Sequence, residues 1–101
     1  MRRIVSFDAQ RSVLVVSGEE DRVTAGRRRR AISAALRARA DVDVDLTGLT
    51  FADSSLMLDL ALLARRLRAS GRALRLRGAQ PNIRRLIELM GLHRLPAVAL
   101  T

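Results

Sequence analysis

Hydrophobic residues alternate with polar ones in some segments of this chain and recur every three or four positions in others. Short apolar or alternating runs at residues 4–7, 12–17, 41–46 and 73–77 predict strands, and a last apolar run at 98–100 is compatible with another. Helical spacing covers about residues 24–40, 54–70 and 83–90. The predicted order is therefore strand, strand, helix, strand, helix, strand, helix and a tail.

This order of elements predicts an α/β fold in one domain. A turn near residues 8–11 pairs the first two strands as an antiparallel hairpin, and Gly18 is expected to close the second strand. The later strand–helix–strand units imply parallel pairing with right-handed crossovers. We therefore expect a mixed β-sheet that opens with a hairpin and continues in βαβ units.

The helix predicted over residues 54–70 has two apolar sides. One stripe lies within about 60° on a helical wheel and must face the sheet; it consists of Leu56, Leu60, Leu63 and Leu67. Ser55 lies about 100° from Leu56 and is predicted to be exposed. It shares its side of the helix with Asp59, Leu62 and Arg66, and Leu58 lies with Leu62 on the far half. This second strip either packs on another element of the chain or binds a partner, and both interpretations are open.

Composition adds a strong positive charge without pointing to nucleic acid. The 101 residues carry a net charge of +9, and all nineteen basic residues are arginines. The arginines are scattered over three helices and a strand, and only two residues are aromatic, so we expect no specific nucleic-acid binding. The run at residues 27–30 winds about 300° around a helix. Arg28 or Arg29 should therefore lie beside Ile32 and Leu36 with its charged head in water.

The residue inventory argues against catalysis. Cysteine is absent and His93 is the single histidine, so thiolate sites, disulfides and histidine clusters are excluded. Asp41, Asp43 and Asp45 alternate along one strand, which we interpret as a solvated sheet face or strand end rather than a cation site. Neither a nucleophile elbow nor a glycine-rich phosphate loop occurs. We expect no catalytic, cofactor or metal site and, without a signal or membrane span, a cytoplasmic protein.

Several stretches together resemble the STAS domain of bacterial anti-sigma factor antagonists. The matching stretches are residues 18–21, 45–51, 53–55, 64–71, 83–89 and 91–95. Asp53-Ser54-Ser55 stands where the second helix of that domain begins, and Asp53 is a suitable helix N-cap. Leu56 and Leu58 occupy positions where the family usually has glycine. The resemblance covers about residues 4–95 and implies a single STAS-like domain over residues 1–101.

The resemblance implies a partner switch. An antagonist of this family binds an anti-sigma factor, usually a GHKL-type serine kinase, and thereby releases a sigma factor. The kinase phosphorylates a serine, here Ser55 with Ser54 as second candidate, and a PP2C-type phosphatase resets the system. The expected partner-binding residues are Ser54, Ser55, Leu58, Asp59, Leu62 and Arg66.

Two other functions remain open from the sequence. One is a STAS subunit that is not phosphorylated, in a phospholipid-trafficking ABC transporter or a stress-signalling scaffold. Such a subunit needs the helix surface but no phosphoacceptor. The other, ranked last, is nucleic-acid binding through the arginines.

Overall fold

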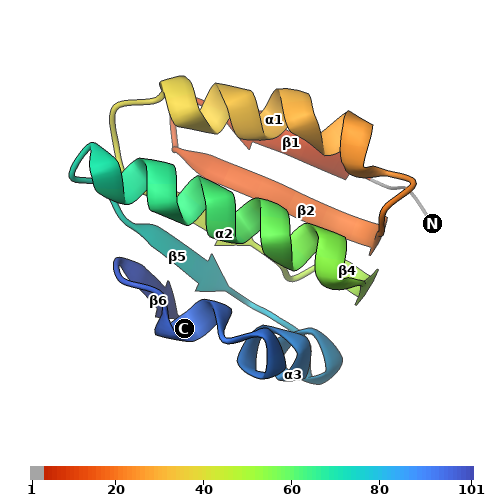
Figure 1. The fold of residues 1–101 in the computed structure, drawn as a ribbon. Helices are drawn as coiled ribbons and strands as arrows, with labels where there is room; N and C mark the ends of the chain where they lie inside the picture. Colours follow the sequence, from red (N-terminus) through yellow and green to blue (C-terminus); the bar gives the residue numbers. More distant parts are fainter. Residues whose placement is uncertain (1–3) are drawn as a thin grey trace.

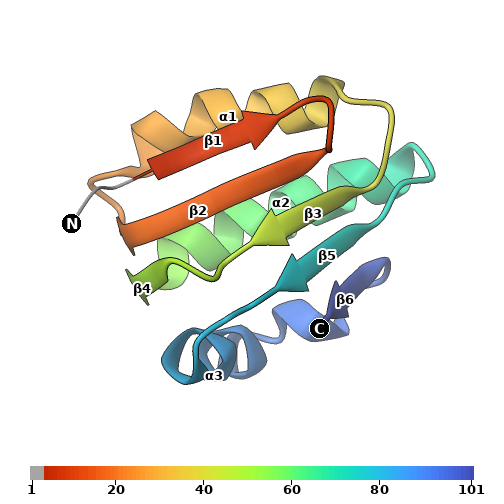
Figure 2. The ribbon, with the colours of Figure 1, turned by 180° about the vertical axis from the view of Figure 1, so that it is seen from behind.

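The computed structural model describes residues 4–101, which form a sheet with helices on one face (Figure 1). The elements in chain order are β1 (Ile4–Asp8), β2 (Val13–Glu20), α1 (Ala25–Arg37), β3 (Val42–Asp45), β4 (Leu49–Ala52), α2 (Ser54–Ala69), β5 (Leu74–Arg77), α3 (Pro81–Met90), the 3₁₀ turn η1 (Leu92–Arg94) and β6 (Val98–Leu100). Helices α1 and α2 cross the sheet side by side, and α3 lies near its lower edge (Figure 1). Figure 2 shows that, within the described residues, the opposite face carries no helix across β1, β2, β3 or β5.

The sheet confirms the predicted fold class. β1 and β2 are antiparallel, and the other strand pairs are parallel, in the order β1-β2-β3-β5-β6. β4 lies off this path and pairs with the end of β2. The opening hairpin followed by parallel units is the α/β arrangement that the alternation of strands and helices predicts.

The end of the second strand differs from the prediction. Gly18 does not close β2, since the strand continues to Glu20. Gly18 lies within the strand and has a positive φ of 80°. The register shifts between Gly18 and Glu19, which is a bulge that re-aims the last residues of the strand toward β4. Glycine tolerates this backbone conformation at no steric cost, so it marks a bend here and not a terminus.

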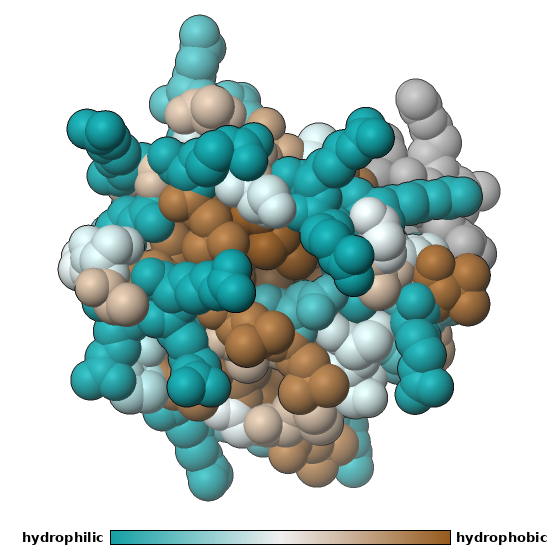
Figure 3. Space-filling model, turned by 45° about the horizontal axis from the view of Figure 1, so that its top comes forward, coloured by the Kyte–Doolittle hydropathy of each residue, from teal (hydrophilic) through white to brown (hydrophobic). Residues whose placement is uncertain are grey.

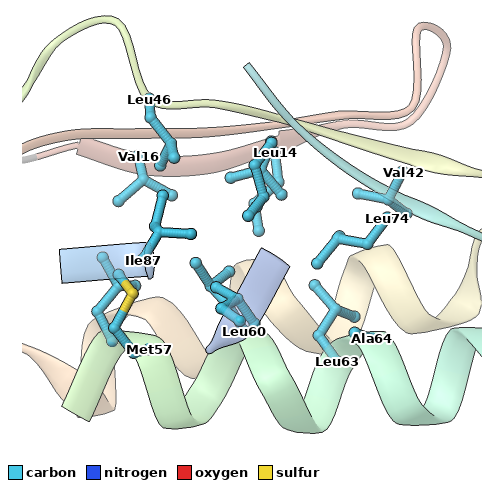
Figure 4. Packing of buried hydrophobic residues seen from close by; sticks show 14 of the residues in the cluster. Leu14, Val16, Val42, Leu46, Met57, Leu60, Leu63, Ala64, Leu74 and Ile87 are labelled. Carbon is cyan, nitrogen blue, oxygen red and sulfur yellow. The ribbon is translucent and has the colours of Figure 1, made fainter. Parts of the chain in front are cut away.

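The core lies between the sheet and the two covering helices (Figure 4). The four leucines predicted to face the sheet from α2 are each at most 1% exposed, which confirms the helical register; they are Leu56, Leu60, Leu63 and Leu67. The strands present alternate residues toward them, as period-two side chains must. Leu14, Val42 and Leu74 are examples, one from each of three strands (Figure 4).

The outer face of the sheet carries the aspartate strand. Asp43 of β3 forms ion pairs with Arg75 and Arg77 of the neighbouring β5. The Asp43 carboxylate thus lies on the sheet face turned away from α1 and α2, opposite to its buried neighbours Val42 and Val44. Among residues 4–101 no group of three or more potential ligand side chains could hold a metal ion. In the same part of the chain, no helix is both long and apolar enough to cross a bilayer.

Candidate functional site

The start of α2 is held by a compact cap. Asp53 is the N-cap residue, and its Oδ1 accepts hydrogen bonds from the Ser55 backbone N–H at 2.9 Å and from the Ser55 hydroxyl at 2.6 Å. Its Oδ2 accepts a bond from the Arg22 N–H at 3.3 Å. The hydroxyl bond from Ser55 is the main cause that lowers the pKa of Asp53 below its ordinary value. The cap therefore fixes a carboxylate and a hydroxyl against the positive end of the helix dipole.

Arg28 of α1 is the central residue of the site and is fully buried. Its Nε donates to Asp59 Oδ2 at 2.7 Å, and its Nη1 donates to Glu20 Oε1 at 3.1 Å. Its Nη2 donates to Ser55 Oγ at 2.9 Å. The Asp21 carbonyl and the Thr24 hydroxyl accept further bonds from Nη1. One guanidinium thus joins β2, α1 and the first turns of α2.

The sequence left open whether Arg28 or Arg29 keeps its charged head in water, and the structure gives that position to Arg29. The charged head of Arg28 is not in water, because acceptors from β2, from α2 and from the loop between β2 and α1 bind its N–H groups inside the protein. Arg29, the other residue considered, is exposed and borders Ile32 and Leu36. The acceptors Glu20, Ser55 and Asp59 lie 8, 27 and 31 positions from Arg28, so no helical wheel could reveal them.

Ser55 is half-buried and not fully exposed as the wheel predicted. Its hydroxyl oxygen accepts a hydrogen bond from Arg28, and its O–H donates one to Asp53, since guanidinium is a donor only and carboxylate an acceptor only. These two bonds hold the hydroxyl inside the site. Ser54, the preceding residue, is exposed.

A groove of about 360 Å³ runs between α1 and α2. Its lining includes the apolar residues Ile32 and Leu36 from α1 and Leu62 from α2, and the charged residues Arg29 and Arg66. Apolar surface gathers in the middle of this helical face and is fringed by polar side chains (Figure 3). Within the described residues, the apolar strip of α2 is therefore only partly covered by its own chain.

The structure brings most of the predicted surface residues to this region. Asp59, Leu62 and Arg66 line the groove, and Asp59 is tied through Arg28 to Ser55. Leu58 is 57% exposed and Leu62 is 53% exposed, although both are large and apolar. Sequence reasoning missed Arg28 and Glu20 as members of the site.

Comparison with known proteins identifies the family of this chain. A family model described as "Mlab, STAS domain" matches residues 4–99, so the chain belongs to the STAS domain family. Among solved structures, it is similar to the phosphorylated form of the Bacillus cell fate determinant SpoIIAA. That match has 25% sequence identity and a TM-score of 0.60, and covers 90% of this chain and 84% of the other. No curated protein sequence matches the chain. The chain is a STAS domain protein that resembles anti-sigma factor antagonists.

Proposed function

We propose that this protein is an anti-sigma factor antagonist whose binding to an anti-sigma factor is controlled by phosphorylation of Ser55. The observation that carries the proposal is the position of Ser55, at the capped start of α2 and linked through Arg28 to the α1–α2 groove. The similarity of the chain to a protein whose structure was solved in a phosphorylated form supports the same function. Ser54, exposed beside it, is the second candidate for modification.

The docking surface in this proposal consists of the start of α2 and the adjoining groove. Exposed leucines supply apolar area, and the arginines at the groove favour an acidic partner surface. The partner is a GHKL-type serine kinase that acts as the anti-sigma factor. The residues proposed to touch it are Ser54, Ser55, Leu58, Asp59, Leu62 and Arg66.

A phosphoryl group at Ser55 would suit a switch physically. It adds roughly −1.5 to −2 charges to the surface that meets the partner. The helix N-terminus tolerates this charge, because its N–H groups and dipole favour anions, so the domain stays folded. Repulsion and the cost of desolvating the phosphate would then release the kinase. A PP2C-type phosphatase would restore the binding form.

In this account the domain is a ligand and a phosphoacceptor and not an enzyme. It contributes no catalytic residue, cofactor or metal ion of its own. Its action is regulation of transcription in a bacterial cytoplasm, through the sigma factor that the kinase releases.

A second candidate function is favoured by the residues that follow Ser55. Leu56 is buried and Leu58 is exposed where the family usually has glycine, and the Ser55 hydroxyl is already engaged in two hydrogen bonds. A STAS subunit of a phospholipid-trafficking ABC transporter or a stress-signalling scaffold would use the surface without modification. The two functions differ in whether phosphate at Ser55 changes partner affinity.

The docking surface can be tested with one leucine. Leu62→Ala should weaken binding to the cognate anti-sigma kinase about tenfold or more, because a large apolar contact is lost at the groove. The domain should remain folded, since Leu62 is 53% exposed and outside the core. The measurement is calorimetric titration of each purified variant against the kinase, with thermal melts alongside.

Leu89→Ala is the matched control. Leu89 is 73% exposed on α3, so the same truncation removes apolar surface away from the groove. It should leave the affinity unchanged. If Leu62→Ala binds as tightly as Leu89→Ala and the unaltered protein, the kinase does not dock on this surface.

A further inference from the structure

Arg28 links the proposed phosphoacceptor to the groove through a single side chain. Nη2 contacts Ser55 Oγ, while Nε contacts Asp59, which lines the groove. Within the described residues, Ser55 Oγ is the hydrogen-bond partner of Nη2, which carries a second N–H. This side chain therefore already reaches the atom that modification would change.

We infer that Arg28 is the internal counter-ion of phosphorylated Ser55, and that its pairing with the phosphate breaks its ion pair with Asp59. This inference rests on the proposed phosphorylation of Ser55. Transfer from ATP forms the bond between Ser55 Oγ and the γ-phosphorus, breaks the bond from that phosphorus to the β,γ-bridging oxygen, and leaves ADP. The hydroxyl proton, which Ser55 donates to Asp53 Oδ1 in the unmodified protein, is released to water.

The charges around Arg28 predict which pairing changes. In the unmodified protein, one guanidinium forms ion pairs with two carboxylates, those of Glu20 and Asp59. A phosphate dianion on Ser55 adds a third anionic partner, and the planar guanidinium fork matches phosphate oxygens well. The Asp59 side chain is 34% exposed and can be hydrated, whereas the Glu20 side chain is 2% exposed and cannot. Asp59 is therefore the carboxylate whose ion pair with Arg28 breaks.

The release of Asp59 would carry the signal into the groove. Asp59 lines the groove together with Arg29 and Arg66. A carboxylate freed from Arg28 would add negative charge there and compete with an acidic partner for these arginines. Modification at the first turn of α2 would thus alter the surface one turn further along the helix.

The experiment uses phosphoserine placed at position 55 by genetic code expansion, so that the partner kinase is not needed. Titration of the phosphate is followed by ³¹P NMR in Glu20→Gln and in Glu20→Gln/Arg28→Met. Both proteins lack the Glu20 charge, and Asp21, Asp53 and Asp59 face the site in both. With Arg28 present, the second ionisation of the phosphate should occur about one pH unit lower, because a positive charge favours the dianion.

The control replaces the neighbouring arginine in the same background. Glu20→Gln/Arg29→Met removes an exposed positive charge from the same helix and should titrate close to Glu20→Gln. Equal titration midpoints in the proteins with and without Arg28 would overturn the inference.

A second measurement needs no variant of Arg28. In the unaltered sequence, the Nε–H resonance of Arg28 should move when Ser55 carries phosphate, since the bond to Asp59 is exchanged. The Nε–H resonance of Arg29 should stay in place. An unmoved Arg28 resonance would overturn the inference even if the methionine variant failed to fold. The partner is absent from both experiments, so they test the inference alone. A partner whose affinity does not change when Ser55 is phosphorylated would contradict the proposed function and leave the inference about Arg28 standing.

Discussion

Replacement of Arg28 by methionine should lower the free energy of unfolding by about 3 to 5 kcal/mol. The cause is less the lost arginine than the carboxylate that it leaves behind. Glu20 is buried, and Arg28 Nη1 at 3.1 Å is its ion-pair partner. Removing one partner of a buried pair leaves an uncompensated charge in a medium that solvates it poorly. The measurement is equilibrium urea unfolding near neutral pH.

Replacement of Glu20, the partner of Arg28 in this ion pair, provides the control. Glu20→Gln/Arg28→Met removes both charges and should recover much of the lost stability, because a neutral amide costs far less to bury than an unpaired carboxylate. Arg29→Met, at an exposed position of the same helix, should stay within about 0.5 kcal/mol of the unaltered protein. If Arg28→Met unfolds at the same urea concentration as Arg29→Met, the buried pair does not stabilise the fold.

Leu60→Ala should destabilise the domain by about 2 to 5 kcal/mol. Leu60 is completely buried between α2 and the sheet (Figure 4), and its truncation removes apolar contacts and leaves a cavity. A loss of this size is a large fraction of the stability of a domain of this length. Urea unfolding measures it directly.

Leu58→Ala is the matched control, two residues earlier in the same helix. Leu58 is 57% exposed, so the same truncation creates no cavity and should change stability by no more than about 0.5 kcal/mol. Similar losses for Leu58→Ala and Leu60→Ala would show that the register of α2 described above is wrong.

The register of α2 could be predicted because its evidence is local. Four leucines spaced by three and four positions define one face without knowledge of any other element. The strand over residues 42–45 was equally visible, since its apolar residues alternate strictly with aspartates. Both signals depend only on the period of the secondary structure.

β4 could not be predicted for the opposite reason. It has four residues, and it exists because Gly18 bends the end of β2 toward it. A strand this short is specified by the partner it pairs with and not by its own alternation. The sequence pattern therefore suggested a loop between β3 and α2.

In the candidate site too, features that depend on one helix could be predicted, and features that depend on a distant partner could not. Residues on one helix face were grouped correctly, because Asp59, Leu62 and Arg66 do line a common groove. The half-burial of Ser55 was missed, because it depends on Arg28 from another helix.

The affinity of the cognate anti-sigma kinase for four forms of this protein tests the central claim most directly. The forms are the unmodified protein, Ser55→Ala, Ser55→Asp and the protein phosphorylated at Ser55. We expect Ser55→Ala to bind nearly as the unmodified protein does, because a small hydroxyl contributes little to the docking surface. Ser55→Asp and the phosphorylated protein should bind at least about tenfold more weakly, from charge and desolvation. Equal affinity for the unmodified, Ser55→Asp and phosphorylated forms would contradict the phosphorylation switch and favour the subunit that docks without modification.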